Sequence, residues 1–152
     1  MKTLILLFLA TSLSTASIAL ANAPAGSESF PILSAKDLEQ RLASGTKTLK
    51  GALDVQKKTP GSVVAARGEY YSWLSQCIGA IEASADSPLW EGCLRFASQL
   101  LRVEVSGETA SQLAQPFKKH RAKWDETLKR LDDADRLFIK QEAEGAAEDL
   151  EP

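Results

Sequence analysis

The sequence predicts an all-α fold: a four-helix bundle-like domain with a disulfide-stapled helical hairpin. Prolines at positions 31, 60, 88 and 116 divide the chain into stretches in which apolar residues recur at helical spacing and do not alternate. Helix-start signals open several of these stretches, and the two cysteines, Cys77 and Cys93, lie in two neighbouring ones. The 129 residues that follow position 23 suffice for one domain with a hydrophobic core but not for two.

The first residues carry the features of an export signal. Lys2 precedes an apolar run from Leu4 to Ala10, and small residues end the segment at Ala23. The apolar run is about half of the ~20 residues that a membrane-spanning helix needs. We therefore predict a signal peptide over residues 1–23, no membrane span, and a location in the bacterial periplasm or outside the cell.

The first helix is expected to begin after Ser34, whose hydroxyl can cap the backbone, with Asp37 in the first turn. One apolar stripe, within about 60° at 100° per residue, is formed by Leu38, Leu42, Leu49 and Leu53. Gly45 lowers helix propensity by roughly 1 kcal/mol relative to alanine, so a break there is an open alternative.

Two further helices are predicted from Thr59-Pro60 and from Ser87-Pro88, since proline suits the first helical position. The apolar face of the earlier one comprises Val63, Ala66, Tyr70, Trp73, Leu74, Cys77 and Ile81. The later one is expected to end near Gly107. Its apolar face comprises Leu89, Trp90, Cys93, Phe96, Ala97 and Leu100, and its opposite side comprises Glu91, Arg95, Gln99 and Arg102.

These two helices form an antiparallel hairpin if the chain turns at residues 84–87. Cys77 then lies seven residues before the turn and Cys93 six after it, so the two are level across the hairpin. In an oxidising compartment the expected result is a structural disulfide. A redox-active pair is the alternative, but redox motifs usually separate their thiols by about two residues.

The fourth helix is predicted to run without a break from Pro116 to about Glu142. Its apolar stripe recurs every seven residues and comprises Phe117, Trp124, Leu131 and Phe138, with Leu113 and Leu128 on the same side. The aromatic residues favour a globular core over an intermolecular coiled coil. The helical domain is therefore expected to span residues 24–142, followed by an acidic disordered tail over residues 143–152.

Catalytic chemistry is not indicated by any motif. The single histidine, His120, stands among basic neighbours that disfavour protonation and repel a metal cation. Ser44 and Lys47 match S-x-x-K, but the other motifs of that enzyme class are absent. Without Lys2 of the leader, the 18 basic residues become 17 against 20 acidic ones, which does not suggest nucleic-acid binding. We predict no enzyme, no metal and no cofactor.

A strip of small residues is the candidate partner-binding surface. Gly68, Ser72, Ser75 and Gly79 lie opposite Cys77 on the second helix and leave little side-chain bulk. Close packing against the first or fourth helix is the favoured interpretation, because small residues let helices approach closely. The functional alternative is a shallow groove that receives a loop or helix of another protein.

The run Cys77-Ile78-Gly79-Ala80-Ile81 resembles a segment of an exported helical family of immunity proteins that neutralise type VI secretion amidase effectors. The resemblance covers about residues 70–101. Ala80 stands where that family commonly has a bulky aromatic residue, and the family's later cysteine has no counterpart here, so no functional residue is transferred.

Two functions are consistent with these features. The first is an exported, non-catalytic protein-binding module, similar to an inhibitor or immunity protein, whose partner is another protein. The second is a structural or chaperone-like envelope protein that forms homo-oligomers through the stripe on the fourth helix.

Overall fold

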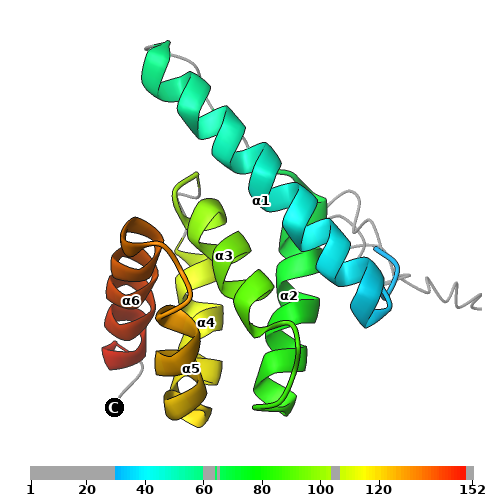
Figure 1. The fold of residues 1–152 in the computed structure, drawn as a ribbon, viewed down its shortest axis with the longest axis vertical. Coiled ribbons are helices and arrows are strands. Elements are labelled where there is room, and N and C mark those ends of the chain that lie inside the picture. The colour runs from blue at the N-terminus through cyan, green and yellow to red at the C-terminus, as the bar shows by residue number, and fades with distance from the viewer. Residues whose placement is uncertain (1–29, 60–63, 65, 104–106, 150–152) are drawn as a thin grey trace, which may run out of the picture.

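A computed structural model describes residues 30–59, 64, 66–103 and 107–149, and these form six α-helices and no strand (Figure 1). The predicted all-α class and the stapled hairpin are confirmed. The predicted signal peptide, residues 1–23, lies outside the described residues. Among the helices that the structure describes, we find no apolar stretch with the length of a membrane span.

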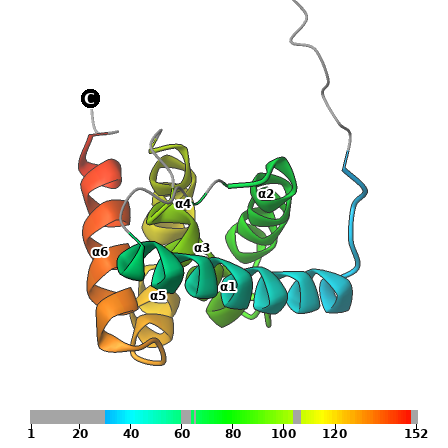
Figure 2. The same cartoon turned by 90° about the horizontal axis from the view of Figure 1, so that it is seen from above.

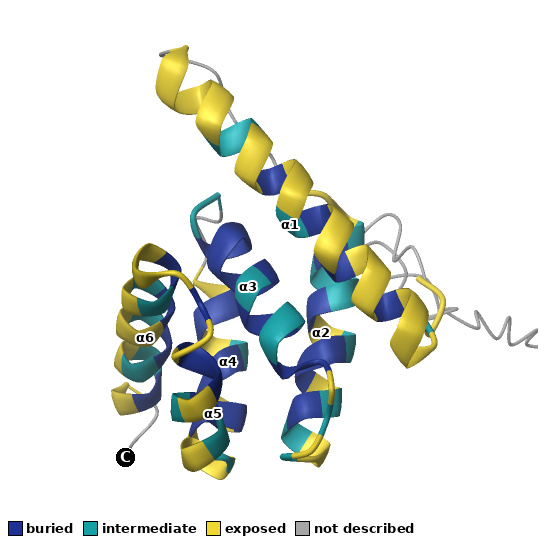
Figure 3. Ribbon diagram, viewed as in Figure 1, coloured by how far each residue is buried: buried dark blue, intermediate teal, exposed yellow. Residues whose placement is uncertain are grey.

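Helix α1, Ala35–Lys58, is long and continuous. Ser34 is its N-cap and accepts a hydrogen bond from the Asp37 N–H at 3.2 Å, as predicted. The helix passes through Gly45 without a break, because this glycine is buried against Phe96 of α3 and packing compensates for its low propensity. Figure 1 shows α1 lying diagonally across α2 (Gly68–Ala83) and α3 (Trp90–Leu101), and Figure 2 shows the same crossing from above. Only a narrow stripe of α1 is buried (Figure 3).

Helices α2, Gly68–Ala83, and α3, Trp90–Leu101, form the predicted hairpin. The Cys77–Cys93 disulfide joins them, with the two Cα atoms 5.8 Å apart and both side chains fully buried. Trp90 closes the turn by donating from Nε1 to the Ser84 carbonyl at 3.2 Å. The hairpin is therefore fixed both by a covalent bond and by a side chain at its turn.

The predicted starts of α2 and α3 need correction. Thr59 ends α1, donating its N–H to the Val55 carbonyl at 2.9 Å, and α2 begins only at Gly68. A residue before proline is disfavoured in helical backbone conformation, which agrees with Thr59 as the extended C-cap of α1. Residues 60–63, where the predicted helix would start, lie outside the described residues, and residues 64, 66 and 67 are not helical. Helix α3 begins two residues after Pro88. Gly107 has a left-handed φ of 71°, but it directly precedes the next helix.

The prediction of one long fourth helix is wrong. The segment folds as α4, Glu108–Lys119, α5, Arg121–Leu128, and α6, Asp133–Glu148. The first break is at His120, where φ is −128° and ψ is 46°. The second precedes Asp132, whose carboxylate caps α6 by accepting the Asp135 N–H at 2.9 Å. Helix α4 also begins before Pro116, which lies inside it.

The heptad stripe is nevertheless part of the core, as the aromatic residues suggested. Phe117, Trp124 and Leu131 are buried, and Phe138 packs partly buried against them. At the centre lies α3, which packs against each of the other helices and is buried on most sides (Figure 3). Gln99, on the side opposite the predicted apolar face, is therefore only 2% exposed.

The acidic C-terminal segment begins as helix and not as a solvated tail. Helix α6 extends to Glu148, and Ala143 and Ala147 are buried. Small alanines at a spacing of four residues let this last turn pack, so the boundary expected at residue 142 is six residues too early. Residues 150–152 lie outside the described residues.

Candidate functional site

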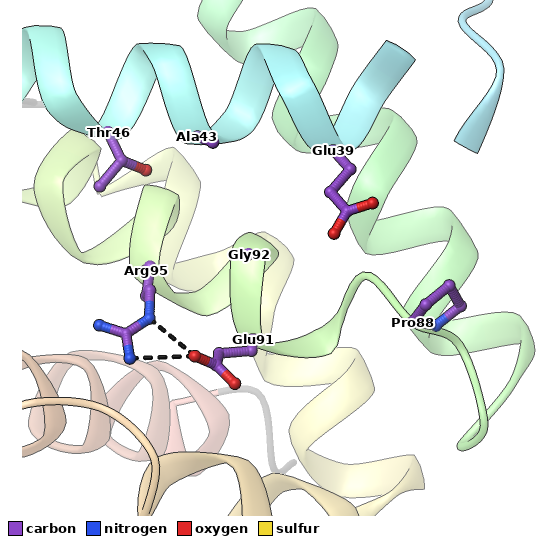
Figure 4. Close-up of a pocket in the computed structure, with 7 residues that line it drawn as sticks. All are labelled: Glu39, Ala43, Thr46, Pro88, Glu91, Gly92 and Arg95. Carbon is purple, nitrogen blue, oxygen red and sulfur yellow. Dashed lines mark hydrogen bonds and ion pairs between the residues drawn. The ribbon is translucent and has the colours of Figure 1, made fainter. Parts of the chain in front are cut away.

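A groove of about 480 Å³ runs between α1 and α3. Figure 4 shows its lining, which comprises Glu39, Ala43 and Thr46 from α1, and Pro88, Glu91, Gly92 and Arg95 from α3 and the turn before it. The α1 residues share one helix face because they stand at positions i, i+4 and i+7. The groove is thus built mainly from two regular helices, with Pro88 contributed by the turn before α3.

The floor of the groove stays open because small residues meet there. Leu42 and Gly45 of α1 point toward α3 and are buried, which turns Ala43 and Thr46 to the side. On α3, a Cβ added to Gly92 would lie 4.0 Å from Leu42 Cδ1, with no nearer atom outside its own surroundings. Neither helix therefore places a large side chain over the floor.

The rim of the groove carries three charged groups. Arg95 donates from Nε and Nη2 to Glu91 Oε1, at 3.1 and 3.0 Å, and also from Nη2 to the Arg130 carbonyl at 2.7 Å. Figure 4 shows Glu39 extending from α1 toward α3 across the groove. Two carboxylates against one guanidinium make the rim formally negative. It therefore suits a positively charged group of a ligand.

The predicted strip of small residues is a surface of α2 and not a close helix contact. Gly68, Ser75 and Gly79 are exposed and Ser72 is half-buried. A Cβ added to Gly79 would meet no atom within 4 Å. Ser75 lies near the edge of α4, with its Oγ 3.5 Å from Gln112 Oε1. The favoured interpretation, burial against the first or fourth helix, is therefore wrong.

The first half of the strip carries an extended segment of the chain itself. A Cβ added to Gly68 would lie 3.6 Å from Phe30 Cζ. Gln76 accepts the Leu33 N–H at 2.8 Å through Oε1 and donates to the Pro31 carbonyl at 3.2 Å through Nε2. Nothing in the sequence pattern indicates this role of Gln76, because its partners lie more than 40 residues away.

A second polar cluster lies between α3 and α6. The carboxylate of Asp135, 5% exposed, accepts from Gln99 Nε2 at 2.9 Å and pairs with Arg102 Nη2 at 2.8 Å. The Arg102 guanidinium also lies 4.9 Å from the centre of the Phe138 ring. Each polar group of this cluster has a protein partner, so the cluster ties the central helix to the last one.

The remaining candidate residues from the sequence line neither the α1/α3 groove nor the α2 strip. His120 places Nε2 2.8 Å from the Glu82 carbonyl and packs edge-on to Trp90. Ser44 and Lys47 are both exposed on α1. In the part of the chain that the structure describes, no group of three or more His, Cys, Asp or Glu residues could hold a metal ion.

Comparison with known proteins gives no relative. No protein-family model and no curated protein matches the sequence, and no solved structure matches the fold. The candidate surfaces are therefore interpreted from their own geometry.

Proposed function

We propose that the chain is an exported, non-catalytic helical scaffold of the bacterial cell envelope that binds another protein, in the manner of an inhibitor or immunity protein. The observation that carries this proposal is the groove between α1 and α3, with its floor of small residues and its charged rim. An apolar centre surrounded by polar groups is the usual anatomy of a protein interface.

The groove is held by a rigid frame. Helix α3 is joined to α2 by the disulfide and to α6 by the Asp135 cluster, while Arg95 is fixed by Glu91 and the Arg130 carbonyl. A preformed site loses little conformational entropy on binding, which favours affinity. The buried disulfide also supports export, because such bonds persist in oxidising compartments.

The partner is expected to insert a basic side chain from a loop or helix end. Glu39 and Glu91 supply the negative rim, and the small floor residues leave space for an aliphatic stem. Lysine and arginine side chains combine such a stem with a charged head. Electrostatic attraction at the rim also speeds association.

Filling the groove tests the proposal. Ala43→Tyr places a large side chain on the floor, and the free energy of unfolding should change by no more than about 0.5 kcal/mol because Ala43 is exposed. Ala122→Tyr, at an exposed position of α5, is the matched control. Proteins captured from a periplasmic extract by the immobilised chain are identified by mass spectrometry. A partner should be retained by the wild type and the control and lost by Ala43→Tyr, whereas equal capture by all three would contradict the groove assignment.

Self-association through the heptad stripe is less well supported. Phe117, Trp124 and Leu131 are at most 8% exposed and belong to three different segments of the fold. They are therefore part of the core of one molecule and do not form a continuous outer seam.

A further inference from the structure

The extended segment Phe30–Leu33 occupies a peptide-like position on the first half of the α2 strip. It is flanked by Arg41, Glu69 and Trp73, and only about 120 Å³ remains open between them. Among the described residues, this is the one part of the candidate strip that another segment of the chain covers. The covering segment is extended and is bound through its main chain.

The segment is recognised mainly through its backbone. Gln76 bonds the N–H of Leu33 and the carbonyl of Pro31, and Ser72 orients the Gln76 amide by accepting from the same Nε2 at 3.2 Å. Nearly every residue offers a backbone carbonyl and an N–H. A side-chain amide that bonds both can therefore accept many sequences, as in other sites for extended peptides.

The apolar contacts of the segment come from Phe30 and Leu33. Phe30 rests on Gly68 and is 37% exposed, Leu33 is half-buried against the core, and Ile32 is 93% exposed. The Phe30 ring is therefore the main apolar anchor, and a competitor has to place an aromatic ring at the same position. A Cβ at position 68 would already be in van der Waals contact with the Phe30 ring, so a side chain much larger than alanine would compete with the ring for this space.

We propose that this α2 surface, Gly68 with Ser72 and Gln76, is a docking site for an extended segment of a partner protein, which displaces Phe30–Leu33. The occupant has an aromatic residue over Gly68 and, three positions later, an apolar residue with a free N–H. This proposal rests on the proposed protein-binding function and adds a second contact for the same partner, on a different face from the α1/α3 groove.

Competition within the chain sets the expected affinities. A tethered segment acts at an effective concentration in the millimolar range, so a free peptide must outcompete it. Phe30→Ser removes the ring that anchors the tethered segment and should raise the apparent affinity for an added peptide. Gln76 should still be required, because it supplies the backbone bonds to either occupant.

The test uses the full oxidised chain and a fluorescent peptide with the sequence of residues 27–34, SESFPILS. Fluorescence anisotropy should show that Phe30→Ser binds the peptide at least about tenfold more tightly than the wild type does. Adding Gln76→Leu to Phe30→Ser should weaken binding at least about tenfold, which corresponds to the loss of roughly one to two hydrogen bonds. Gln115→Leu, at an exposed position of α4, is the matched control and should leave binding unchanged.

A second variant keeps the result interpretable if Gln76→Leu impairs folding. Gly68→Leu, added to Phe30→Ser, changes an exposed position at the start of α2 and should abolish peptide binding without lowering the melting temperature. Equal binding by all variants, or no saturable binding to Phe30→Ser, would overturn the proposal. A molecular mass that doubles with concentration in Phe30→Ser would also overturn it, by identifying a second copy as the occupant.

The two surfaces can be judged separately. Ala43→Tyr should leave peptide binding intact, and the Gln76 and Gly68 variants leave the α1/α3 groove unaltered. Peptide binding that persists while Ala43→Tyr still captures the partner would reject the groove alone. Loss of capture by Ala43→Tyr without any peptide binding would reject the α2 site alone.

Discussion

At the scale of single residues, Gly45 lies at a close approach of α1 to α3. A Cβ at this position would lie 2.6 Å from Phe96 Cε2. The Phe96 ring is fully buried and has Tyr70 and Trp73 beside it, with ring centres 5.7 and 6.2 Å away. The ring has little room to move, so a glycine is required where α1 crosses α3.

Gly45→Ala should therefore destabilise the fold although alanine is the better helix former. Overpacking is expected to cost roughly 1–3 kcal/mol, against a propensity gain of about 1 kcal/mol, which leaves a net loss near 1 kcal/mol. Gly51→Ala is the matched control on the same helix, because its Cβ would meet nothing within 4 Å. It should gain up to about 1 kcal/mol. Urea denaturation of both variants checks the opposite signs, and a stabilised Gly45→Ala would contradict the packing argument.

Residues whose partners are close in the chain were predictable, and residues with distant partners were not. The cap at Ser34 and the pairing of Cys77 with Cys93 follow from local pattern and from elimination. Gln99 lies on the side opposite the predicted apolar face of its helix and is nevertheless buried. Its hydrogen-bond partner, Asp135, lies on α6 and is 36 residues away in the sequence. A polar residue can be buried when the fold places a hydrogen-bond partner beside it. The periodicity of apolar residues within one helix carries no information about such a distant partner.

At the scale of helices, the continuous stripe over α4, α5 and α6 concealed two breaks. The stripe stays on the core side through both interruptions, since Phe117, Trp124 and Leu131 are all buried. Periodicity alone therefore could not distinguish one helix from three. A local signal for the second break does exist in the sequence, because Asp132 precedes α6 in the position of an N-cap.

The cap at Asp132 should make the stability of α6 depend on pH. The Asp135 N–H bond to this carboxylate, with Lys50 nearby, holds the pKa of Asp132 below its ordinary value of 3.8. A lowered pKa in the folded state means stability that is present above pH 3.8 and lost as the pH falls through the lowered pKa. Asp132→Ala should therefore cost about 1 kcal/mol at neutral pH.

The loss of unfolding free energy caused by Asp132→Ala should become smaller as the pH is lowered, because the wild type then loses its charged cap as well. Asp132→Asn keeps a capping oxygen without the charge and should lose only a few tenths of a kcal/mol, with little change between neutral and acidic pH. Urea denaturation at neutral pH and at about pH 3 measures both differences. A loss for Asp132→Ala that is the same at both values would show that the charge of the carboxylate contributes nothing.

At the scale of the whole molecule, stability depends on how α3 is held. This helix packs against all the others, and the disulfide fixes it to α2 while the Asp135 cluster fixes it to α6. Helix α1 then packs across the outside through one buried stripe (Figure 3). Both candidate binding surfaces adjoin this frame, so losing it should affect them together.

Removing the disulfide is therefore expected to lower stability without changing the fold. The two cysteines are 16 residues apart, and closing a loop of that size stabilises a protein by about 3 kcal/mol in the chain-entropy model. Cys77→Ala with Cys93→Ala should lower the melting temperature by about 10 °C and leave the helical circular dichroism spectrum unchanged. Reducing agent should lower the melting temperature of the wild type by a similar amount and have no effect on the double variant, which is its control.

Because both sulfurs are fully buried, reduction of the wild type should accelerate in denaturant, where the hairpin opens. Two reactive thiols per chain in denaturing, non-reducing conditions would show instead that the cysteines are not paired and would remove the covalent part of the frame.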